Sequence, residues 1–423
     1  MANPSVSRTQ MNSPKRNSFR DRFPLAIVSN RPGYHWFVVA TVCVGAFMAA
    51  LDASIVNIAL PTLQKQFHVS LNVIEWVSLS YLLTIGSLIV ALGRIADMFG
   101  RRWMYAFGFS IFIVGSLLCG FAPNLSFLLV ARIVQALGAA MLQANSVAII
   151  TAVTPVTARG KAIGIQGSAQ AIGLSIGPAV GGALLALTGW RWIFFVNLPV
   201  GLIGTILGIL LLPKDTKKAA REPFDYFGAL LLAPTLVALI YLLNTGVKLG
   251  FSSLLMPASL VIAVVGLLLF LWVERRSKSP MVDLNLFRIP AFSIGNVTGV
   301  ISFAVMYGVT LLGPFYLDYV EKIGSLQAGL YMTIIPIGMT LFTPLAGALA
   351  DRFGTRLLTV AGMASAAMGS LLLAFMGGGL TKPFLILGLF LVGVGLGVFT
   401  PPNNSSVMGS APSHRLGVAG GIL

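Results

Sequence analysis

The chain has 423 residues, of which 57% are hydrophobic and only 9% are charged. Soluble domains carry about a quarter charged residues, so this composition excludes an ordinary soluble protein. The net charge of +16 does not indicate nucleic-acid binding, because the basic residues lie between long apolar runs rather than on one domain. Each run is about 20 residues long, enough to cross a bilayer. We predict an all-α polytopic membrane protein.

The apolar runs predict twelve membrane spans and the start of a thirteenth near Leu416. A basic tail, residues 1–35, precedes the first run, which shows no small-residue cleavage site and is therefore expected to be retained. The expected spans are 36–61, 73–96, 103–121, 125–153, 160–187, 191–212, 226–245, 254–273, 291–317, 326–350, 357–377 and 383–409.

The distribution of lysine and arginine predicts the topology. Basic residues concentrate in the tail and in every second loop. The other loops hold only Lys65, Arg191, Lys248, Lys322 and Lys382. Cytoplasmic loops of membrane proteins carry the excess of positive charge. We therefore expect a multi-pass protein of the cell inner (plasma) membrane with a cytoplasmic N-terminus.

An internal repeat predicts the domain organisation. The loops Gly93–Arg102 and Gly347–Arg356 share the pattern G-x-x-A-D-x-F-G-x-R, after spans two and ten respectively. Transporters built from two six-helix halves repeat every six spans, so two spans are expected as an insertion between the halves. The expected divisions are a cytoplasmic tail at 1–35, a six-helix bundle at 36–212, two inserted helices with linkers at 213–290, and a second bundle at 291–423.

The same repeat predicts that the second bundle is incomplete. Arg159, at the start of span five, corresponds to Arg415, at an offset of 256. Span six ends near residue 212, so its counterpart would end well beyond Leu423. We expect the last one to two helices of the bundle to be missing from this chain.

Two ionisable residues inside spans are candidates for proton coupling. Asp52 lies about two thirds of the way along span one, and Arg132 lies within span four. Intramembrane ionisable groups are costly and generally functional, and each needs a partner or water. A carboxyl group in a cavity that opens alternately to each side can bind and release a proton. The alternatives are a structural hydrogen bond for Asp52 and, for Arg132, a side chain that reaches the membrane interface.

Span five carries a stripe of small residues. Gly173, Gly177 and Gly181 recur every four residues and fall on nearly one face of a helix, with Pro178 among them. Such a face lets another membrane helix approach closely. Tight packing without a direct role in function is the alternative interpretation.

The two repeated loops each join two spans in very few residues. The residues concerned are Gly93, Asp97, Gly100, Arg101 and Arg102 in the first copy and Gly347, Asp351 and Gly354 in the second. Glycines permit a tight turn, Asp97 can accept from backbone N–H groups at the start of span three, and both arginines are expected at the cytoplasmic surface. Ordinary turn chemistry explains much of this pattern.

These motifs resemble those of the major facilitator superfamily, in particular its fourteen-span drug:proton antiporter branch. Span one reads LDASIVNIALP, and the first loop matches G-x-x-x-D-x-x-G-R-[KR] with Met98 in place of the usual arginine. Span four is similar to R-x-x-Q-G, with Ala136 in place of the glycine, and WRWIFFVNLPVG resembles the start of span six in that branch. The antiporter motif G-x8-G-x3-G-P-x2-G-G is matched at Gly164, Gly173, Gly177, Pro178, Gly181 and Gly182.

The resemblance implies a rocker-switch fold with one central cavity and export of drugs or other amphipathic molecules against protons. It implies that Asp52 is the proton site, that Arg132 tunes it, that span five helps to seal the cavity, and that the repeated loops form a cytoplasmic gating loop. Polar residues of spans one, four and five are candidates to line that cavity, namely Asn57, Gln135, Gln143, Gln166 and Gln170. The expected partners are the lipid bilayer, the substrate and protons.

Other functions stay open at this stage. The chain could export one specific metabolite, such as a siderophore, an antibiotic or an amino acid, or it could be a non-transporting membrane partner. We expect no enzyme activity, no metal and no cofactor, because no catalytic constellation, ligand spacing or phosphate-binding loop is present, and the proton gradient would supply the energy. Whether a periplasmic adaptor binds stays open.

Overall fold

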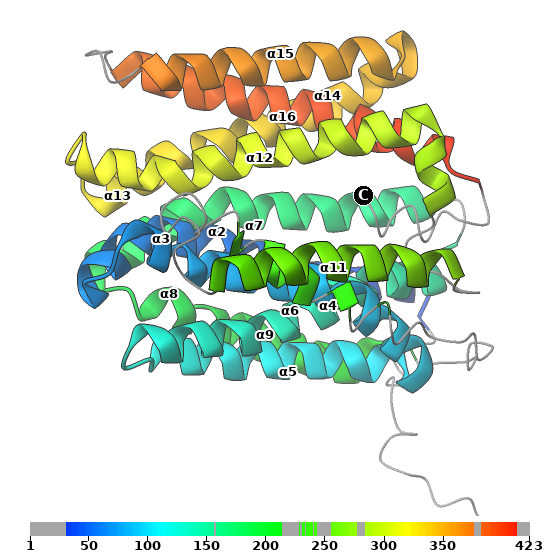
Figure 1. The fold of residues 1–423 in the computed structure, drawn as a ribbon. Helices are drawn as coiled ribbons and strands as arrows, with labels where there is room; N and C mark the ends of the chain where they lie inside the picture. The colour runs from blue at the N-terminus through cyan, green and yellow to red at the C-terminus, as the bar shows by residue number, and fades with distance from the viewer. Residues whose placement is uncertain are drawn as a thin grey trace, which may run out of the picture.

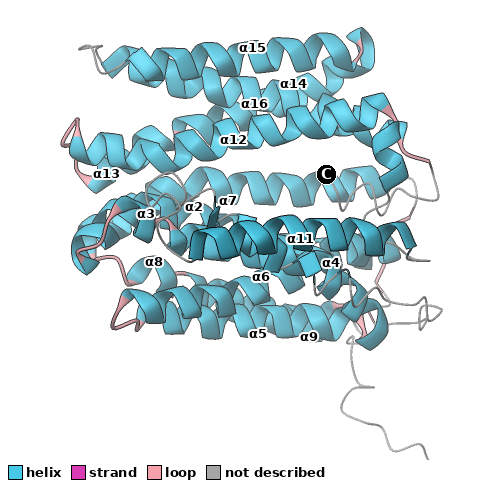
Figure 2. Cartoon of the chain, in the orientation of Figure 1, coloured by secondary structure: helices cyan, strands magenta, loops and turns pink. Residues whose placement is uncertain are grey.

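The computed structural model describes residues 31–155, 158–213, 255–276, 284–375 and 382–412, with short pieces at 228, 231–232, 234–239 and 241–242. Within these residues the regular structure consists of helices (Figure 2). The expected span at 226–245 is described only in these short pieces, and the thirteenth span, from Leu416, lies wholly outside the described residues.

The helices follow the apolar runs closely. They are α2 (Tyr34–Phe67), α3 (Leu71–Ile74), α4 (Trp76–Phe99), α5 (Arg101–Gly120), α6 (Leu125–Val153), α7 (Arg159–Leu187), α8 (Trp192–Phe195), α9 (Asn197–Leu211), α11 (Leu255–Arg276), α12 (Pro290–Tyr319), α13 (Ser325–Met332), α14 (Ile334–Phe353), α15 (Thr355–Ala374) and α16 (Lys382–Ser410), with a 3-10 helix at Leu284–Arg288. In the described residues, eleven helical segments are long and apolar enough to cross a membrane. The all-α membrane fold expected from the composition is confirmed.

Two groups of nearly parallel helices make up the bundle (Figure 1). In the first helix group, α2–α9, α2 packs on α7, and α6 packs on both α4 and α5. In the second helix group, α12–α16, α16 packs on α12, α14 and α15. The groups meet where α7 contacts α13 and α14, and where α2 contacts α12.

The repeated loops turn the chain in the same way in both groups. Gly100 alone separates α4 from α5, and Gly354 alone separates α14 from α15. Both residues have positive φ, 108° and 79°, which L side chains rarely adopt. A glycine is therefore required at each turn. We call this end of the bundle the Gly100 end and the opposite one, where α2 ends, the Lys65 end.

Candidate ionic site

A buried ion pair joins α2 to α6. Arg132 Nη1 lies 2.6 Å from Asp52 Oδ2, and the two side chains are 1% and 0% exposed. The helix that carries Arg132 begins after Asn124, whose side chain accepts from the backbone N–H of Phe127 at 2.9 Å. The structure thus brings together the two residues that the sequence singles out, and full burial excludes an Arg132 side chain that reaches the interface.

Arg132 is held by further contacts on its other sides. Its Nε donates to the carbonyl oxygen of Val77 at 3.0 Å, and Nη1 also donates to Gln135 Oε1 at 2.7 Å. The guanidinium carbon lies 4.2 Å from the centre of the Tyr81 ring and 5.9 Å from that of Phe194. Cations over aromatic faces are stabilised, more so away from water. The charge is therefore satisfied inside the bundle.

The Asp52 carboxylate accepts hydrogen bonds from three side chains. Besides Arg132, Gln135 Nε2 and Asn197 Nδ2 each donate to Oδ1 at 2.8 Å. Gln135 Nε2 also donates to Ser116 Oγ at 2.7 Å. Both oxygens of this buried carboxylate therefore have hydrogen-bond donors. We name Asp52, Arg132, Gln135 and Asn197 the ionic cluster.

Asn197 is the member of the ionic cluster that the sequence analysis did not single out. It is the first residue of α9 and is fully buried. Its place within WRWIFFVNLPVG, as a lone amide at the start of an apolar span, was the available signal.

The candidate cavity residues lie in different environments. Gln135 belongs to the ionic cluster, and Asn57 is buried and accepts from Ser78 Oγ at 2.9 Å. Gln143 and Gln166 are half-buried, whereas Gln170 is exposed. Their role in binding a substrate stays a prediction.

The glycine stripe of α7 lies directly on α2. A Cβ at Gly173 would be 2.5 Å from the carbonyl oxygen of Phe47, and one at Gly177 would collide with the Ser54 side chain. A Cβ at Gly181 would lie 2.5 Å from Ile58 Cγ2. These contacts flank Asp52 on the same helix, so the stripe sets how closely α7 approaches the helix of the ionic cluster.

The remaining residues of the antiporter motif face elsewhere. A Cβ at Gly182 would collide with the carbonyl oxygen of Ser325 in α13, and a Cβ at Gly329 would collide with that of Pro178. Nothing lies within 4 Å of a Cβ placed on Gly164. The motif thus serves two interfaces, one within the first helix group and one between the groups.

Polar side chains join the groups at the Lys65 end. Lys65 Nζ lies 2.6 Å from Asp318 Oδ2, and the Tyr319 hydroxyl donates to Gln64 Oε1 at 2.9 Å. Towards the Gly100 end, Ser175 and Thr340 of α7 and α14 are 3.4 Å apart. Still nearer that end, an added Cβ at Gly164, Gly167 or Gly347 would meet open space.

One expectation for the gating loop is wrong. Arg102 does not lie at the surface: it is 3% exposed, and its Nη2 donates to the carbonyl oxygen of Ile209 at 2.6 Å. The last carbonyls of a helix lack partners within it and attract a cation, so Arg102 satisfies the end of α9. Arg101 is half-buried and donates to the carbonyl oxygen of Ala148 at 3.4 Å. The side chains of Asp97 and Asp351 lie outside the described part of the chain.

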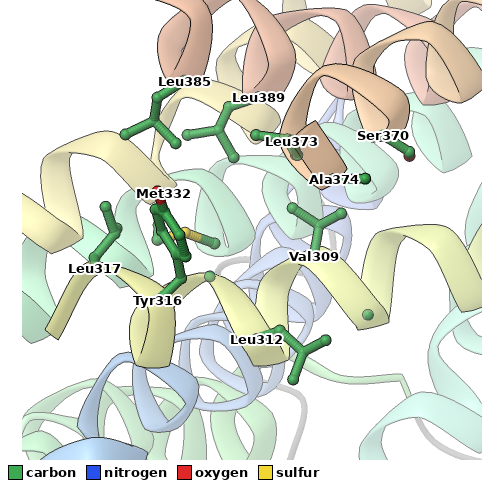
Figure 3. A pocket seen from close by; sticks show the side chains of 12 residues that line it. Val309, Leu312, Tyr316, Leu317, Met332, Ser370, Leu373, Ala374, Leu385 and Leu389 are labelled. Carbon is green, nitrogen blue, oxygen red and sulfur yellow. The ribbon is translucent and has the colours of Figure 1, made fainter. Parts of the chain in front are cut away.

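A cavity of about 270 Å³ lies within the second helix group, among α12, α13, α15 and α16 (Figure 3). Its walls are mostly apolar, and they include Gly308, Ser370 and Leu389. Counted from the first residue of each helix, these three occupy the positions of Asp52 in α2, Ser116 in α5 and Arg132 in α6. By this count, a glycine and a leucine in the second helix group stand at the helix positions that the ion pair has in the first.

Together, the repeated helix groups and the buried ion pair define a membrane protein of the secondary-transporter type. Residues 42–423 match the model of the Major Facilitator Superfamily, and the chain belongs to that family. The family consists of transporters rather than enzymes, and the resemblance expected from the sequence is confirmed.

Relatives include several drug-resistance proteins. The chain is 35% identical to the riboflavin transporter RibZ of Clostridioides difficile over 92% of this chain and 84% of the relative. It is 36% identical to the multidrug resistance protein Stp of Mycobacterium tuberculosis, over 90% and 70%. It is 29% identical to the tetracenomycin C resistance and export protein of Streptomyces glaucescens, over 92% and 72%.

Solved structures support the fold alone. A POT family transporter in complex with 5-aminolevulinic acid superposes with a TM-score of 0.68 at 16% identity, over 91% of this chain and 86% of that one. The xylose transporter XylE of E. coli gives a TM-score of 0.62 at 17% identity, over 92% and 89%.

Proposed function

We propose that this protein is a proton-coupled transporter that exports amphipathic small molecules, drugs among them, by alternating access. The observation that carries the proposal is the buried ionic cluster, in which Asp52 of α2 pairs with Arg132 of α6 at 2.6 Å. Removal of one partner of such a pair leaves an uncompensated buried charge. Proton binding to Asp52 would neutralise it and leave Arg132 unpaired, which favours a different packing of α2 and α6.

The glycine stripe supports a link between that change and transport. Gly173 and Gly177 pack on α2 beside Asp52, while Gly182 of the same helix packs on α13 in the second helix group. A shift of α2 against α7 would therefore change the packing of α7 on α13, where the two groups meet. In antiport, proton and substrate favour opposite states of one equilibrium, so proton entry drives substrate out.

The arrangement of the two groups supports an inward-open state. They are joined at the Lys65 end through the Lys65–Asp318 pair and the contact of Gly182 with α13, whereas a Cβ added to Gly164 or Gly347, towards the other end, would have no atom within 4 Å. With the orientation that the basic loops predict, the Gly100 end faces the cytoplasm of a cell whose plasma membrane holds the protein. A cytoplasmic substrate would then enter between the groups.

Transport of one specific compound is the second candidate. The relative named a riboflavin transporter, at 35% identity, favours it, while the relatives named multidrug resistance and tetracenomycin export proteins favour drug export. These names leave the breadth of substrates as a question for experiment.

Efflux from proteoliposomes tests the proposal. The protein is reconstituted, ethidium is loaded on the side of the Gly100 end, and an imposed proton gradient is expected to drive ethidium across while a pH-sensitive dye reports proton counterflow. Asp52→Asn should abolish the gradient-driven part, and circular dichroism checks that this variant, which leaves Arg132 without its anion, is still folded. Unchanged gradient-driven efflux in Asp52→Asn would refute proton coupling at Asp52. If riboflavin rather than ethidium is carried by the unmodified protein, the second candidate replaces drug export.

A further inference from the structure

Asn197 carries a buried acceptor that has no partner in the described part of the chain. Its Nδ2 donates to Asp52 Oδ1 at 2.8 Å, but its own Oδ1 is fully buried and accepts no hydrogen bond from any described residue. Buried polar atoms nearly always have a partner, so an orphaned one calls for an explanation. The unused oxygen belongs to the same amide that touches the Asp52 carboxylate.

The hydrogen-bond needs of Asp52 reverse when it binds a proton. A carboxylate only accepts, and accordingly Arg132, Gln135 and Asn197 all present N–H groups to it. A protonated carboxyl group has one O–H donor and then requires an acceptor. If Arg132, Gln135 and Asn197 all kept their N–H groups towards the neutral acid, its O–H would have no acceptor.

Only one contacting side chain can supply the acceptor. Arg132 has no acceptor atom. Gln135 Oε1 already accepts from Arg132 Nη1 at 2.7 Å and from the Cys119 thiol at 3.7 Å. Among the described side chains that bond to Asp52, this leaves Asn197 Oδ1 as the unoccupied oxygen.

The other groups around the ionic cluster do not compete for the proton. Among the described residues, the ionisable ones are Arg132 on α6, Tyr81 on α4, Cys119 on α5 and Tyr307 on α12, whose ring interacts electrostatically with Arg132, while α7 presents glycines and α8 presents Phe194. A neutral phenol or thiol has no basic site that takes up a proton near neutral pH. The Tyr81 hydroxyl donates to the carbonyl oxygen of Ala49 at 3.5 Å, and the thiol donates to Gln135. Arginine stays charged. The carboxylate is thus the group in this cluster that can take up a proton.

We infer that Asn197 is a positioning residue whose side-chain amide changes its hydrogen bond when the protonation state of Asp52 changes. When Asp52 gains a proton, the amide turns over about its Cβ–Cγ bond, and Oδ1 accepts from the new O–H in place of the Nδ2 contact. This inference rests on the proposed proton binding at Asp52. Because Asn197 is the first residue of α9, whose Gly201 and Gly204 pack on α5, the change of hydrogen bond is transmitted to the start of a packed helix.

Infrared difference spectroscopy tests the amide turnover directly. The purified full chain in lipid nanodiscs, with its asparagines labelled in the side-chain carbonyl with carbon-13, is cycled between neutral and acidic pH. We expect a carboxylic-acid band that Asp52→Asn abolishes. We also expect a labelled amide carbonyl band that moves to lower frequency on acidification, and that both Asp52→Asn and Asn197→Val abolish. Thr205→Val, on the same helix, is the matched control and should keep both bands, since the Thr205 hydroxyl donates to the carbonyl oxygen of Gly201 within α9.

The outcomes separate the two proposals. If no carboxylic-acid band depends on Asp52, proton binding there is refuted, and the inference falls with it. If that band is present but no labelled amide band depends on Asn197, proton coupling stands and the amide turnover is refuted.

Transport of ethidium provides the second readout. Serine can donate and accept, whereas valine can do neither. Asn197→Ser should therefore retain most of the gradient-driven efflux, and Asn197→Val should lose it by about tenfold or more, the cost of one hydrogen bond to a charged group. An equal loss in both variants would indicate a packing role and overturn the inference.

Discussion

Ser54 of α2 lies so close to Gly177 of α7 that a single added Cβ would run into its hydroxyl group. We predict that Gly177→Ala forces the two helices apart, destabilises the protein by about 1–3 kcal/mol, as overpacking of a tight core does, and impairs efflux. Ser54→Gly in the same chain removes the obstructing atoms and should restore most of the lost stability and most of the lost efflux. Thermal unfolding in detergent and ethidium efflux measure the two effects.

Gly164 provides a control from within the same motif. An added Cβ there meets nothing within 4 Å, so Gly164→Ala should leave efflux unchanged and raise helix stability by up to about 1 kcal/mol. Equal damage from Gly164→Ala and Gly177→Ala would show that the motif acts through backbone freedom rather than through close packing on α2.

Replacement of Arg132 alone should lower the free energy of unfolding far more than replacement of both Arg132 and Asp52. Arg132→Met leaves the Asp52 charge buried without its cation, and we expect a loss of about 3–5 kcal/mol in the free energy of unfolding. Adding Asp52→Asn removes that charge and should recover most of the loss, although gradient-driven efflux stays absent. Equilibrium unfolding in mixed micelles compares the two variants. Equal stability of the single and double variants would show that the buried charge of Asp52 is not what destabilises Arg132→Met.

The sequence predicts the helices well because bilayer thickness dictates the length of each apolar run. It also indicates Asp52 and Arg132, since charges inside spans are rare, and the structure shows them in contact. Asn197 and the buried position of Arg102 are set by helix packing, which a hydropathy pattern does not encode. An arginine beside a loop looks the same in sequence whether it faces water or satisfies the end of a neighbouring helix.

The contact of Arg102 with α9 gives a further prediction. Arg102→Met removes the hydrogen bond to the carbonyl oxygen of Ile209, and we expect a loss of about 1.5–3 kcal/mol, the range for a hydrogen bond to a charged group. Arg102→Lys is the comparison variant, because an ammonium group keeps the charge and can still donate one hydrogen bond, so it should lose less. The same unfolding assay measures both variants. Equal losses would indicate that packing of the guanidinium, and not the bond to the end of α9, is what stabilises this position.

The Lys65–Asp318 pair should bias the protein towards the state with the Lys65 end closed. The two side chains are 57% and 29% exposed, and exposed pairs contribute about 0.2–1 kcal/mol, so Asp318→Asn should shift the balance of closed and open states by up to about fivefold. The charge swap of Lys65→Asp with Asp318→Lys should restore it.

Distances between spin labels at the exposed Gln66 and Gln327, measured by pulsed electron resonance in nanodiscs, report the two populations of the Lys65 end directly. Asp318→Asn should enlarge the long-distance population, and the swapped pair should return it to the level of the unmodified chain. High salt should mimic the effect of Asp318→Asn, because exposed charges are screened. If Asp318→Asn and the swap leave the same distances, then Gly182 on α13 and Tyr319 on Gln64 hold this end closed without help from the ion pair.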